Sequence, residues 1–330
     1  MRNREIHMSN HWSEYWRQGH TTSFGDALSG NYEGILQSVW EPTFSRLQTD
    51  FVAVDVGSGN GSVPLLLRES LSNSAKVGKV YGVDLAEVQL SENNKSENST
   101  IEIELISNTA CETLPFENES IDLYMSQFGF EYSSIESSLN EASRVLKRDG
   151  QFSIVFHHGN SMILNRNKKI LRLIELPQAS DLVEYLREIA IAMGSMTSAN
   201  DIARIKQDPK CESIRVKINQ AIKDLVNYDE LSAQDSQLMM FIAQFFKEGI
   251  FWPLAKKQQF IEFIKLQMDT LKLRLTELVN ASFDEDKLAR FIGIFKQNLL
   301  EINEIKVLKN EQKEILGWYL DARKIENCEV

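Results

Sequence analysis

The first half of the chain alternates short apolar runs with segments of helical spacing. Residues 133–150 are the clearest helical segment, because apolar side chains recur every three or four positions until Gly150, where we expect the helix to end. Repeated strand–helix units of this size predict a Rossmann-like α/β fold, a doubly wound and mostly parallel sheet with helices on both faces. The five predicted strands are residues 51–56, 78–85, 101–106, 120–127 and 150–158.

After about residue 160 the apolar positions follow a helical period almost throughout. Ser282 and Glu285 have the spacing of a capping box at a helix start. We therefore expect residues 161–314 to be an α-helical region, either a cap over the substrate or a dimerisation bundle. The longest series of apolar steps is Ile261, Ile264, Met268, Leu271, Leu275 and Leu278. The three later lysines that we expect on a solvated helix face are Lys306, Lys309 and Lys313.

Residues 317–324 depart from this period and alternate as a strand does. One interpretation is a final strand within residues 315–330 that returns to the sheet, so that the helices form an insertion in the α/β domain. The other interpretation is the end of the last helix. The pattern alone leaves both open.

Composition adds few restrictions. The chain has 330 residues, 42% of them apolar, which is enough for a full-sized core, and it contains no apolar run long enough to span a membrane. We expect a soluble, cytoplasmic protein with no membrane partner. Because Cys111, Cys211 and Cys328 lie far apart, neither a disulfide framework nor a metal site is expected.

The charge is divided unevenly. Residues 1–160 carry 11 Lys and Arg against 22 Asp and Glu, whereas residues 161–330 carry 25 against 25. The whole net charge of -11 therefore belongs to the first half. Binding to a nucleic-acid backbone needs a basic stripe, and none is visible, so we do not expect a nucleic-acid partner.

A glycine-rich stretch, DVGSGNG at residues 55–61, directly follows the first predicted strand. A strand-to-helix turn at the carboxyl edge of a parallel sheet is a common ligand site, and glycines there permit positive φ and close approach of a ligand. No lysine follows Gly61, which disfavours a P-loop, and the G-x-G-x-G order differs from the dinucleotide fingerprint. Asp84 ends the second predicted strand, where a carboxylate can accept hydrogen bonds from both ribose hydroxyls.

These stretches resemble the first two motifs of class I S-adenosylmethionine-dependent methyltransferases, as VDVGSGNGS at residues 54–62 and VYGVDL at residues 80–85. ETLPFENESIDLYMSQFGFEY, residues 112–132, is similar to the ubiquinone/menaquinone-biosynthesis type. EASRVLKRDGQFSIV, residues 141–155, resembles the unit that contains the fifth strand of that family. The resemblance implies S-adenosylmethionine as cofactor, S-adenosylhomocysteine as product, and a methyltransferase core over residues 51–160.

The resemblance also implies roles for single residues. The loop glycines would approach the methionine part of the cofactor, Asp55 its amino group and Asp84 its ribose, while the end of the fourth strand would lie beside the reactive methyl. Leu85 and the residues near Ala110 would contact adenine. The whole implied cofactor-binding set is Asp55, Gly57, Ser58, Gly59, Gly61, Asp84, Leu85, Ala110, Cys111, Ser126, Gln127, Phe128 and Trp16.

Position 110 departs from the family pattern. The ubiquinone/menaquinone type commonly has an acidic residue there that accepts from the adenine amino group, and the Ala110 side chain cannot accept. Backbone groups near Cys111, water or Asn108 would then hold adenine, and one lost neutral hydrogen bond costs about 1 kcal/mol. The departure leaves a non-catalytic cofactor binder open as an alternative.

Residues 1–50 are expected to form a helical N-terminal segment. The spacing of Trp12, Trp16 and Gly19 resembles the opening segment of thiopurine- and tellurite-type methyltransferases, which closes over the cofactor. A sulfonium cation favours aromatic faces, which suits such a lid. Trp12 and Trp16 are also one turn apart, as in a helix that simply packs against the domain, and the two interpretations are compatible.

Methyl transfer is an in-line displacement on an activated carbon, so the enzyme mainly positions and desolvates its reactants. A base is needed only where the acceptor must lose a proton. Because neighbouring strand residues face opposite ways, one of the two adjacent histidines should point into the cleft, and a structural role fits either one equally well. The catalytic candidates at this edge are His157, His158, Glu131 and Tyr132.

The leading hypothesis is an enzyme that methylates O, N or C of a small organic metabolite. A protein or peptide methyltransferase that uses the helical region for docking is the second hypothesis, and a cofactor-binding scaffold protein is the third. A homodimer through the helical region fits the sequence as well. The acceptor is not identified by any motif.

Overall fold

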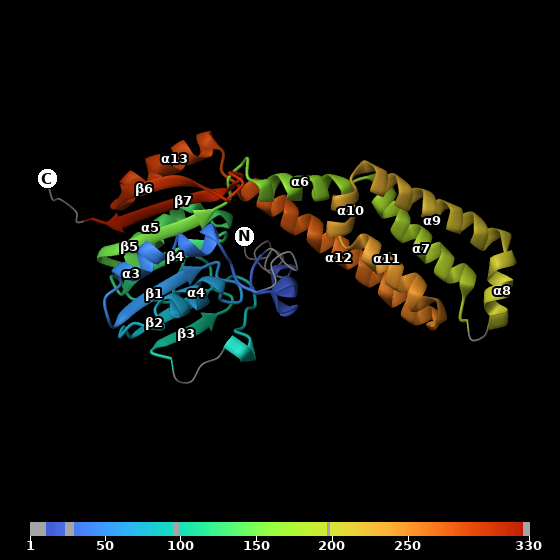
Figure 1. The fold of residues 1–330 in the computed structure, drawn as a ribbon, viewed down its shortest axis with the longest axis horizontal. Helices are drawn as coiled ribbons and strands as arrows, with labels where there is room; N and C mark the ends of the chain where they lie inside the picture. The colour runs from blue at the N-terminus through green and yellow to red at the C-terminus, as the bar shows by residue number, and fades with distance from the viewer. Residues whose placement is uncertain (1–10, 24–29, 95–98, 197–198, 326–330) are drawn as a thin grey trace. The chain divides into compact units, whose positions relative to one another are not determined.

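The computed structural model describes residues 11–23, 30–94, 99–196 and 199–325. The chain divides into two compact units (Figure 1). Met1–Leu164 and Asn280–Val330 together form the first, which we call the sheet unit. Asn165–Val279 form the second, which we call the helical unit.

A seven-stranded sheet builds the sheet unit, in the order β3-β2-β1-β4-β5-β7-β6. The strands β1 to β5 run parallel, and β7 pairs antiparallel with β5 and with β6. The predicted Rossmann-like α/β fold is confirmed, and so are the five strands predicted in the first half. The strands are β1 (Phe51–Val56), β2 (Gly78–Val83), β3 (Ile101–Ile106), β4 (Ile121–Gln127), β5 (Leu146–Phe156), β6 (Leu300–Lys309) and β7 (Ile315–Lys324).

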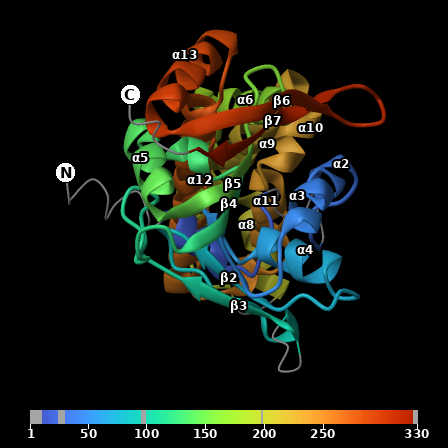
Figure 2. The ribbon, with the colours of Figure 1, turned by 90° about the vertical axis from the view of Figure 1, so that its left-hand side faces the viewer.

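Helices cover both faces of this sheet, because strands that are apolar on both sides must be buried on both sides. Figure 2 shows α5 and α13 on one side and α3 and α4 on the other. Each side has its own apolar core, one centred on Phe152 and Phe291 and the other on Trp40 and Leu67. The helices are α2 (Ile35–Ser38), α3 (Glu41–Arg46), α4 (Ser62–Ser70), α5 (Ile135–Val145) and α13 (Glu285–Phe295), with 3-10 turns η2 (Glu92–Asn94), η3 (Phe130–Tyr132) and η5 (Lys296–Asn298).

The expectation of a helical region over the whole of residues 161–314 was wrong at its C-terminal end, where β6 is a strand. A β-bulge between Ile302 and Glu304 shifts the register against β7. It inserts one residue into the alternation, so Ile302 and Ile305 are three positions apart and imitate a helical step. Lys306 and Lys309 therefore lie on a strand and not on a helix face, and Lys313 lies in the turn before β7.

Two predicted helix boundaries also move. The helix expected to end at Gly150 ends at Val145, and β5 begins at the next residue. Helix α13 is capped by Asp284, whose Oδ1 accepts from the backbone N–H of Lys287 at 2.7 Å, and not by Ser282.

The alternating segment at residues 317–324 forms most of β7, which lies between β5 and β6. In Figure 1 the red strands β6 and β7 lie beside the green β5, although the helical unit separates them in the sequence. The helical unit is thus inserted between the fifth strand and the last two.

The helical unit has an apolar core of its own, in which α7 packs along α9. Leu186, Ile218, Phe245 and Ile261 are almost completely buried there. None of the helices over the described residues has the length and apolar character of a membrane span. The helices are α6 (Met162–Ile174), α7 (Pro177–Met193), α8 (Ala199–Gln207), α9 (Pro209–Tyr228), α10 (Glu230–Asp235), α11 (Leu238–Lys247) and α12 (Leu254–Ala281), with the 3-10 turn η4 (Gly249–Phe251).

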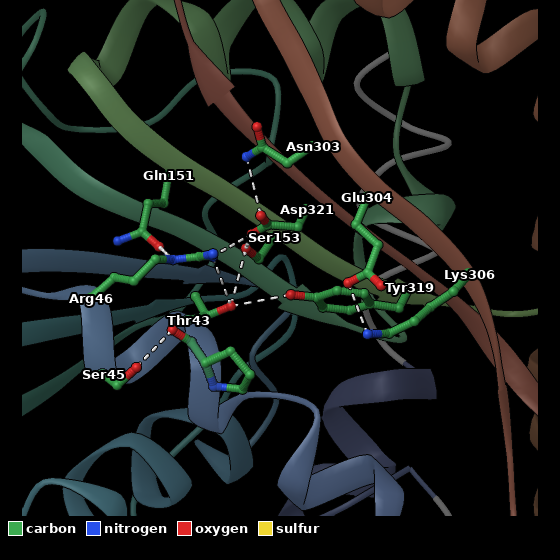
Figure 3. Close-up of polar contacts among 11 residues, drawn as sticks. Thr43, Ser45, Arg46, Gln151, Ser153, Asn303, Glu304, Lys306, Tyr319 and Asp321 are labelled. Atoms are coloured by element: carbon green, nitrogen blue, oxygen red, sulfur yellow. Dashed lines mark hydrogen bonds and ion pairs between the residues drawn. The ribbon is translucent and has the colours of Figure 1, made fainter.

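A buried carboxylate fixes the antiparallel end of the sheet to α3 (Figure 3). Asp321 on β7 accepts from Arg46 Nη2 at 2.7 Å and from Ser153 Oγ on β5 at 2.6 Å. Its second oxygen accepts from Asn303 Nδ2 on β6 at 3.1 Å. Because all three partners are donors, the buried charge is well compensated, and this network is part of the scaffold.

Candidate functional site

The glycine loop joins β1 to α4 at the carboxyl edge of the sheet. Gly57, Gly59 and Gly61 have φ values of 65°, 53° and 87°, which side chains rarely adopt. A Cβ on Gly57 would lie 2.6 Å from Gly129 Cα, and one on Gly59 would lie 2.5 Å from the Trp16 indole. Both glycines are therefore required by backbone conformation and by close contact.

Asp84 follows β2 and holds the loop in place. Its Oδ2 accepts from the Gly59 N–H and its Oδ1 from the Ala86 N–H, both at 2.8 Å. Burial raises the pKa of Asp84, and the two amide hydrogen bonds oppose that shift. The side chain is only partly covered, and the neighbouring Leu85 is 40% exposed. A ligand can therefore reach this corner of the site.

Asp55, at the end of β1, is buried without a partner. Its exposed fraction is 1%, and neither carboxylate oxygen has a hydrogen-bond partner among the described residues. Burial raises the pKa of Asp55 to about 8, with the negative charge of Asp84 adding to the effect. Ser58 opposes the shift, but its hydroxyl makes no hydrogen bond of ordinary geometry to Asp55. A cationic donor would complete this position.

The loop after β3 packs against the segment that follows Asp84. The Thr109 N–H donates to the Asp84 carbonyl at 2.9 Å, and the Asn108 N–H donates to the Ala86 carbonyl at 3.4 Å. Ala110 and Cys111 are half-buried beside it, and burial raises the pKa of the Cys111 thiol. The structure thus brings both residues to the edge that carries Asp84.

Ser126, Gln127 and Phe128, the residues predicted at the end of β4, differ in whether a polar atom remains for a ligand. The Ser126 hydroxyl donates to the Val56 carbonyl at 2.7 Å and accepts from the Phe130 N–H at 2.9 Å, so it ties the backbone together. Gln127 Oε1 accepts from Trp40 Nε1 at 2.6 Å, whereas its buried Nε2 has no partner in the described ranges of the chain. Phe128 has a φ of 60° and lies buried, which keeps its ring at the carboxyl edge.

His157 and Glu131 form a buried pair after β5 and β4. Glu131 Oε1 accepts from the His157 backbone N–H at 2.8 Å and lies 4.0 Å from His157 Nε2. Burial lowers the pKa of His157 to about 3 and raises that of Glu131 to about 7. Glu131 Oε2 and His157 Nδ1 have no partner among the described residues. The His157 ring is therefore neutral near pH 7, and Glu131 is the member of the pair that can accept or release a proton there.

His158 faces the other side of the sheet. Its ring stacks on Trp318 at a centroid distance of 4.4 Å, and its Nδ1 accepts from the Asn160 N–H at 2.9 Å. Burial lowers its pKa. These contacts indicate that His158 has a structural role. Tyr132 instead stays near His157, with its ring edge-on at 6.1 Å.

The N-terminal aromatic segment, residues 11–22, covers the glycine loop. The Trp16 indole lies directly on Gly59 and is stacked on Trp12 at 6.1 Å. Asn60 Nδ2 donates to the carbonyls of Trp16 and His20 at 2.9 and 2.8 Å. The segment is therefore fastened to the loop by the loop's own asparagine. Phe24, which follows in the same aromatic stretch of the sequence, lies outside the described residues.

Sequence reasoning missed three residues that complete this edge. Asn60 fastens the N-terminal segment, Trp40 holds Gln127, and Tyr32 is buried against Phe128 at a ring distance of 6.2 Å. For Asn60 the sequence did offer a signal, because an amide side chain stands between two glycines of the loop.

Two surface cavities, of about 430 and 600 Å³, lie in the sheet unit away from this edge. The first is lined by residues such as Glu119 and Arg148, and the second by residues such as Asn31 and Arg68. We give more weight to the glycine-loop edge, because Trp16 lies directly on Gly59 there and the buried Asp55 carboxylate has no partner among the described residues. No group of three or more His, Cys, Asp or Glu within the described ranges is placed to hold a metal ion.

Residues 54–154 match the family model described as a methyltransferase domain. A search of curated proteins found no match. Among solved structures, a S-adenosylmethionine-dependent methyltransferase from Methanosarcina mazei is 15% identical, with 90% of this chain and 99% of that chain covered and a TM-score of 0.38. A structure from echinomycin biosynthesis is 11% identical, with coverages of 98% and 94% and a TM-score of 0.47.

A chain of the complex that contains the Haloferax volcanii Trm112 methyltransferase activator is 22% identical, with a TM-score of 0.30. The match covers 38% of the present chain and spans about half, 55%, of that one. The family match begins one residue before Asp55 and ends within β5, so it includes the glycine loop, Asp84 and the end of β4. Residues 54–154 therefore match a methyltransferase domain, which forms the part of the sheet unit that runs from β1 into β5.

Proposed function

We propose that this enzyme transfers the methyl group of S-adenosylmethionine to O, N or C of a small organic metabolite by in-line displacement. The observation that supports this best is Asp55, a buried carboxylate beside the glycine loop that has no partner within the described residues. An isolated buried carboxylate is costly unless a cation pairs with it. The amino group of the cofactor would supply that cation.

Each part of the cofactor has a matching set of residues. The Asp84 oxygens keep lone pairs for the ribose hydroxyls, and the exposed Leu85 offers an apolar face to adenine. Ala110 and Cys111 would border adenine, whose amino group must use backbone, water or Asn108. Gln127 and Phe128 would lie beside the methyl. The motif order over residues 50–157 supports the ubiquinone/menaquinone-biosynthesis type as the subfamily.

The chain's own residues then position and desolvate the reactants. The bound cofactor supplies an activated methyl carbon, so Trp16 and Trp12 need only exclude water and face the sulfonium with their rings. We propose that the N-terminal segment acts as this lid. Its attachment through Asn60 lets the glycine loop and the lid respond to the cofactor together.

Calorimetric titration with S-adenosylmethionine and with S-adenosylhomocysteine tests the proposal. We expect both to bind at one site per chain, and Gly59→Arg to abolish binding because its side chain must enter the space of Trp16. Gly293→Arg is the matched control, since Gly293 is exposed on α13 with no atom near a Cβ. Failure of the wild type to bind either compound would refute the proposal.

A protein substrate is the second candidate. Several large apolar side chains of the helical unit are exposed, among them Val216, Leu231 and Leu266, and exposed apolar patches often mark docking surfaces. The same surface would serve a homodimer. Sedimentation of the purified protein distinguishes them: a monomer with apolar helices exposed favours a protein substrate, and a dimer that Leu266→Glu dissociates favours self-association.

A further inference from the structure

The two edge strands of the sheet differ in what they present to another strand. The strand order places β3 at one end and β6 at the other, as Figure 2 shows. Within the described residues β6 pairs with β7 alone, and its outer side makes no backbone hydrogen bond. The ten residues of β6 include neither proline nor glycine. An open edge of this kind can pair with a strand of another chain.

The middle of β6 is its regular stretch. The pairing with β7 shifts just before Glu304 and just after Leu308, and the residues between them pair without interruption. Glu304 and Lys306 are two positions apart in this stretch, so they share one face. Lys306 Nζ donates to Glu304 Oε2 at 2.8 Å and lies 4.9 Å from the centre of the Tyr319 ring (Figure 3). Both charged side chains are about half exposed.

Symmetry restricts how two copies of this edge can pair. Two antiparallel copies of one strand that continue a sheet are related by a two-fold axis perpendicular to the sheet, and residues directly opposite each other face the same side. The axis must therefore pass through one residue, which lies opposite itself. An axis through Glu304 would oppose two glutamates, and an axis through Lys306 would oppose two lysines. An axis through Ile305 places each Glu304 opposite Lys306 of the other copy, so opposite charges meet twice.

The other edge strand does not allow the same arrangement. Glu102 and Glu104 share one face of β3, where they lie 3.2 and 2.8 Å from Lys79 Nζ on β2. An axis through Ile103 would set Glu102 opposite Glu104, and an axis through either glutamate would oppose it to itself. Like charges directly opposite each other are unfavourable. The β3 edge is therefore protected against pairing with itself, whereas the charges of the β6 edge favour it.

We propose that β6 is the edge through which a second copy of this chain binds, antiparallel and with the two-fold axis at Ile305, so that the two sheets join into one. Three strands separate β6 from β1, so the glycine loop takes no part in the contact. The inference therefore does not depend on the proposed function. Because the regular stretch is short, we expect a weak dimer with a dissociation constant on the order of 100 µM.

Sedimentation equilibrium of the full chain, over a concentration range that brackets this value, tests the proposal. We expect a reversible monomer–dimer equilibrium that added salt weakens. Lys306→Glu should weaken it roughly tenfold or more, because both opposite-charge pairs become like-charge pairs. Glu304→Lys should have the same effect. Lys313→Glu, which makes the same charge change at an exposed position in the turn before β7, is the matched control and should associate as the wild type does.

The double variant that combines Glu304→Lys with Lys306→Glu exchanges the two charges and restores both opposite pairs. We expect its association to return to the wild-type strength. Damage to the fold cannot produce such a recovery, and Tm values of all variants show whether any of them is destabilised. A double variant that stays as weak as the single ones would overturn the register centred on Ile305.

A disulfide at the axis gives a second readout, which does not depend on charge. Ile305→Cys would place two thiols directly opposite each other, at a Cα separation of about 4.5–5.5 Å, which a disulfide can span. We expect a dimer that mild oxidation cross-links and a reductant releases, above the background of the three natural cysteines. Glu311→Cys, exposed in the same turn as Lys313, is the control. Equal cross-linking of both variants would overturn the proposed contact.

Three further results would also overturn the inference. The first is a wild type that stays monomeric at every concentration, and the second is a Lys306→Glu variant that associates as strongly as the wild type. The third is a dimer that Leu266→Glu dissociates and Lys306→Glu does not, because self-association would then run through the helical unit.

Discussion

The sheet unit and the helical unit treat their buried polar groups differently. In the helical unit, buried Lys257 donates to the Gly194 carbonyl at 2.7 Å, and buried Ser236 donates to the Ala233 carbonyl at 2.8 Å. In the sheet unit, Asp55 and His157 have buried polar atoms at the carboxyl edge for which the described part of the chain offers no partner. Such atoms lower stability until something fills the site. The comparison teaches that, among the described residues, the unpartnered buried atoms of the sheet unit gather mainly at a candidate ligand site, whereas the helical unit, with Gln178 Oε1 as an exception, pairs its buried polar groups within its own core.

The largest effect that would sharpen this contrast is a core truncation in the helical unit. Leu186→Ala removes a side chain that is completely buried in α7, and we expect unfolding to become easier by about 2–5 kcal/mol. Cofactor affinity should not change, because every proposed contact lies in the sheet unit. Thermal unfolding and calorimetry measure the two quantities. Leu231→Ala, at a position 72% exposed, is the control and should change neither.

Next in size is the loss of Asp84. Asp84→Ala removes the clamp on Gly59 together with the proposed ribose contact, and we expect roughly hundredfold weaker cofactor binding, about 3 kcal/mol. Asp122→Ala is matched to it, because Asp122 Oδ2 also accepts a backbone N–H at 2.8 Å, from Val52, but at the opposite edge of the sheet. That control should lower the Tm and leave the affinity unchanged. Equal affinity losses in both variants would mean that Asp84 acts only through the fold.

Asp55→Asn should move stability and affinity in opposite directions. Folded Asp55 keeps its proton up to a pKa of about 8, whereas the unfolded carboxyl loses it near 3.8. The folded state therefore binds more protons between these values, so stability falls as the pH rises through that window.

The asparagine should remove this part of the pH dependence, stabilise the cofactor-free protein at the upper end of the window, and weaken cofactor binding roughly tenfold. Chemical unfolding at several pH values measures the first two effects. Calorimetry in two buffers of different ionisation enthalpy should also show that the wild type releases protons on binding. An unchanged affinity in Asp55→Asn would break the link between the unpartnered carboxylate and the cofactor.

The smallest expected effect concerns the lid. Trp16→Ala opens the space over Gly59, and we expect the cofactor to dissociate several-fold faster, a change of about 1 kcal/mol or less. Stopped-flow dissociation measures this rate. Gln18→Ala, on the exposed side of the same segment, should behave as the wild type. If both variants release the cofactor at the wild-type rate, the N-terminal segment is packing and not a lid.

Much of the sheet unit could be predicted from local pattern. Alternation and β-branched runs located β1 to β5, and the glycine loop, with Asp84 after the next strand, indicated the family before any coordinates. Each of these patterns extends over only a few neighbouring residues, so the sequence alone displays it. The strands keep their apolar runs because both faces of this sheet are buried under helices. The same reading failed at β6, because one bulged residue converts a period of two into an apparent helical step.

The sequence by itself determined the Rossmann-like fold and the methyltransferase domain, and it predicted the residues around the glycine loop as a cofactor site. Only the tertiary structure decided which of the candidates are left with a free atom. Ser126 and His158 use their polar groups on backbone N–H and carbonyl groups. Asp55, Gln127 and His157 instead have atoms that no described residue pairs with. The reason is that the hydrogen-bond partners lie elsewhere in the sequence: Trp40 pairs with Gln127, and Glu131 pairs with the His157 backbone N–H. Burial and pairing exist only after those parts have packed together.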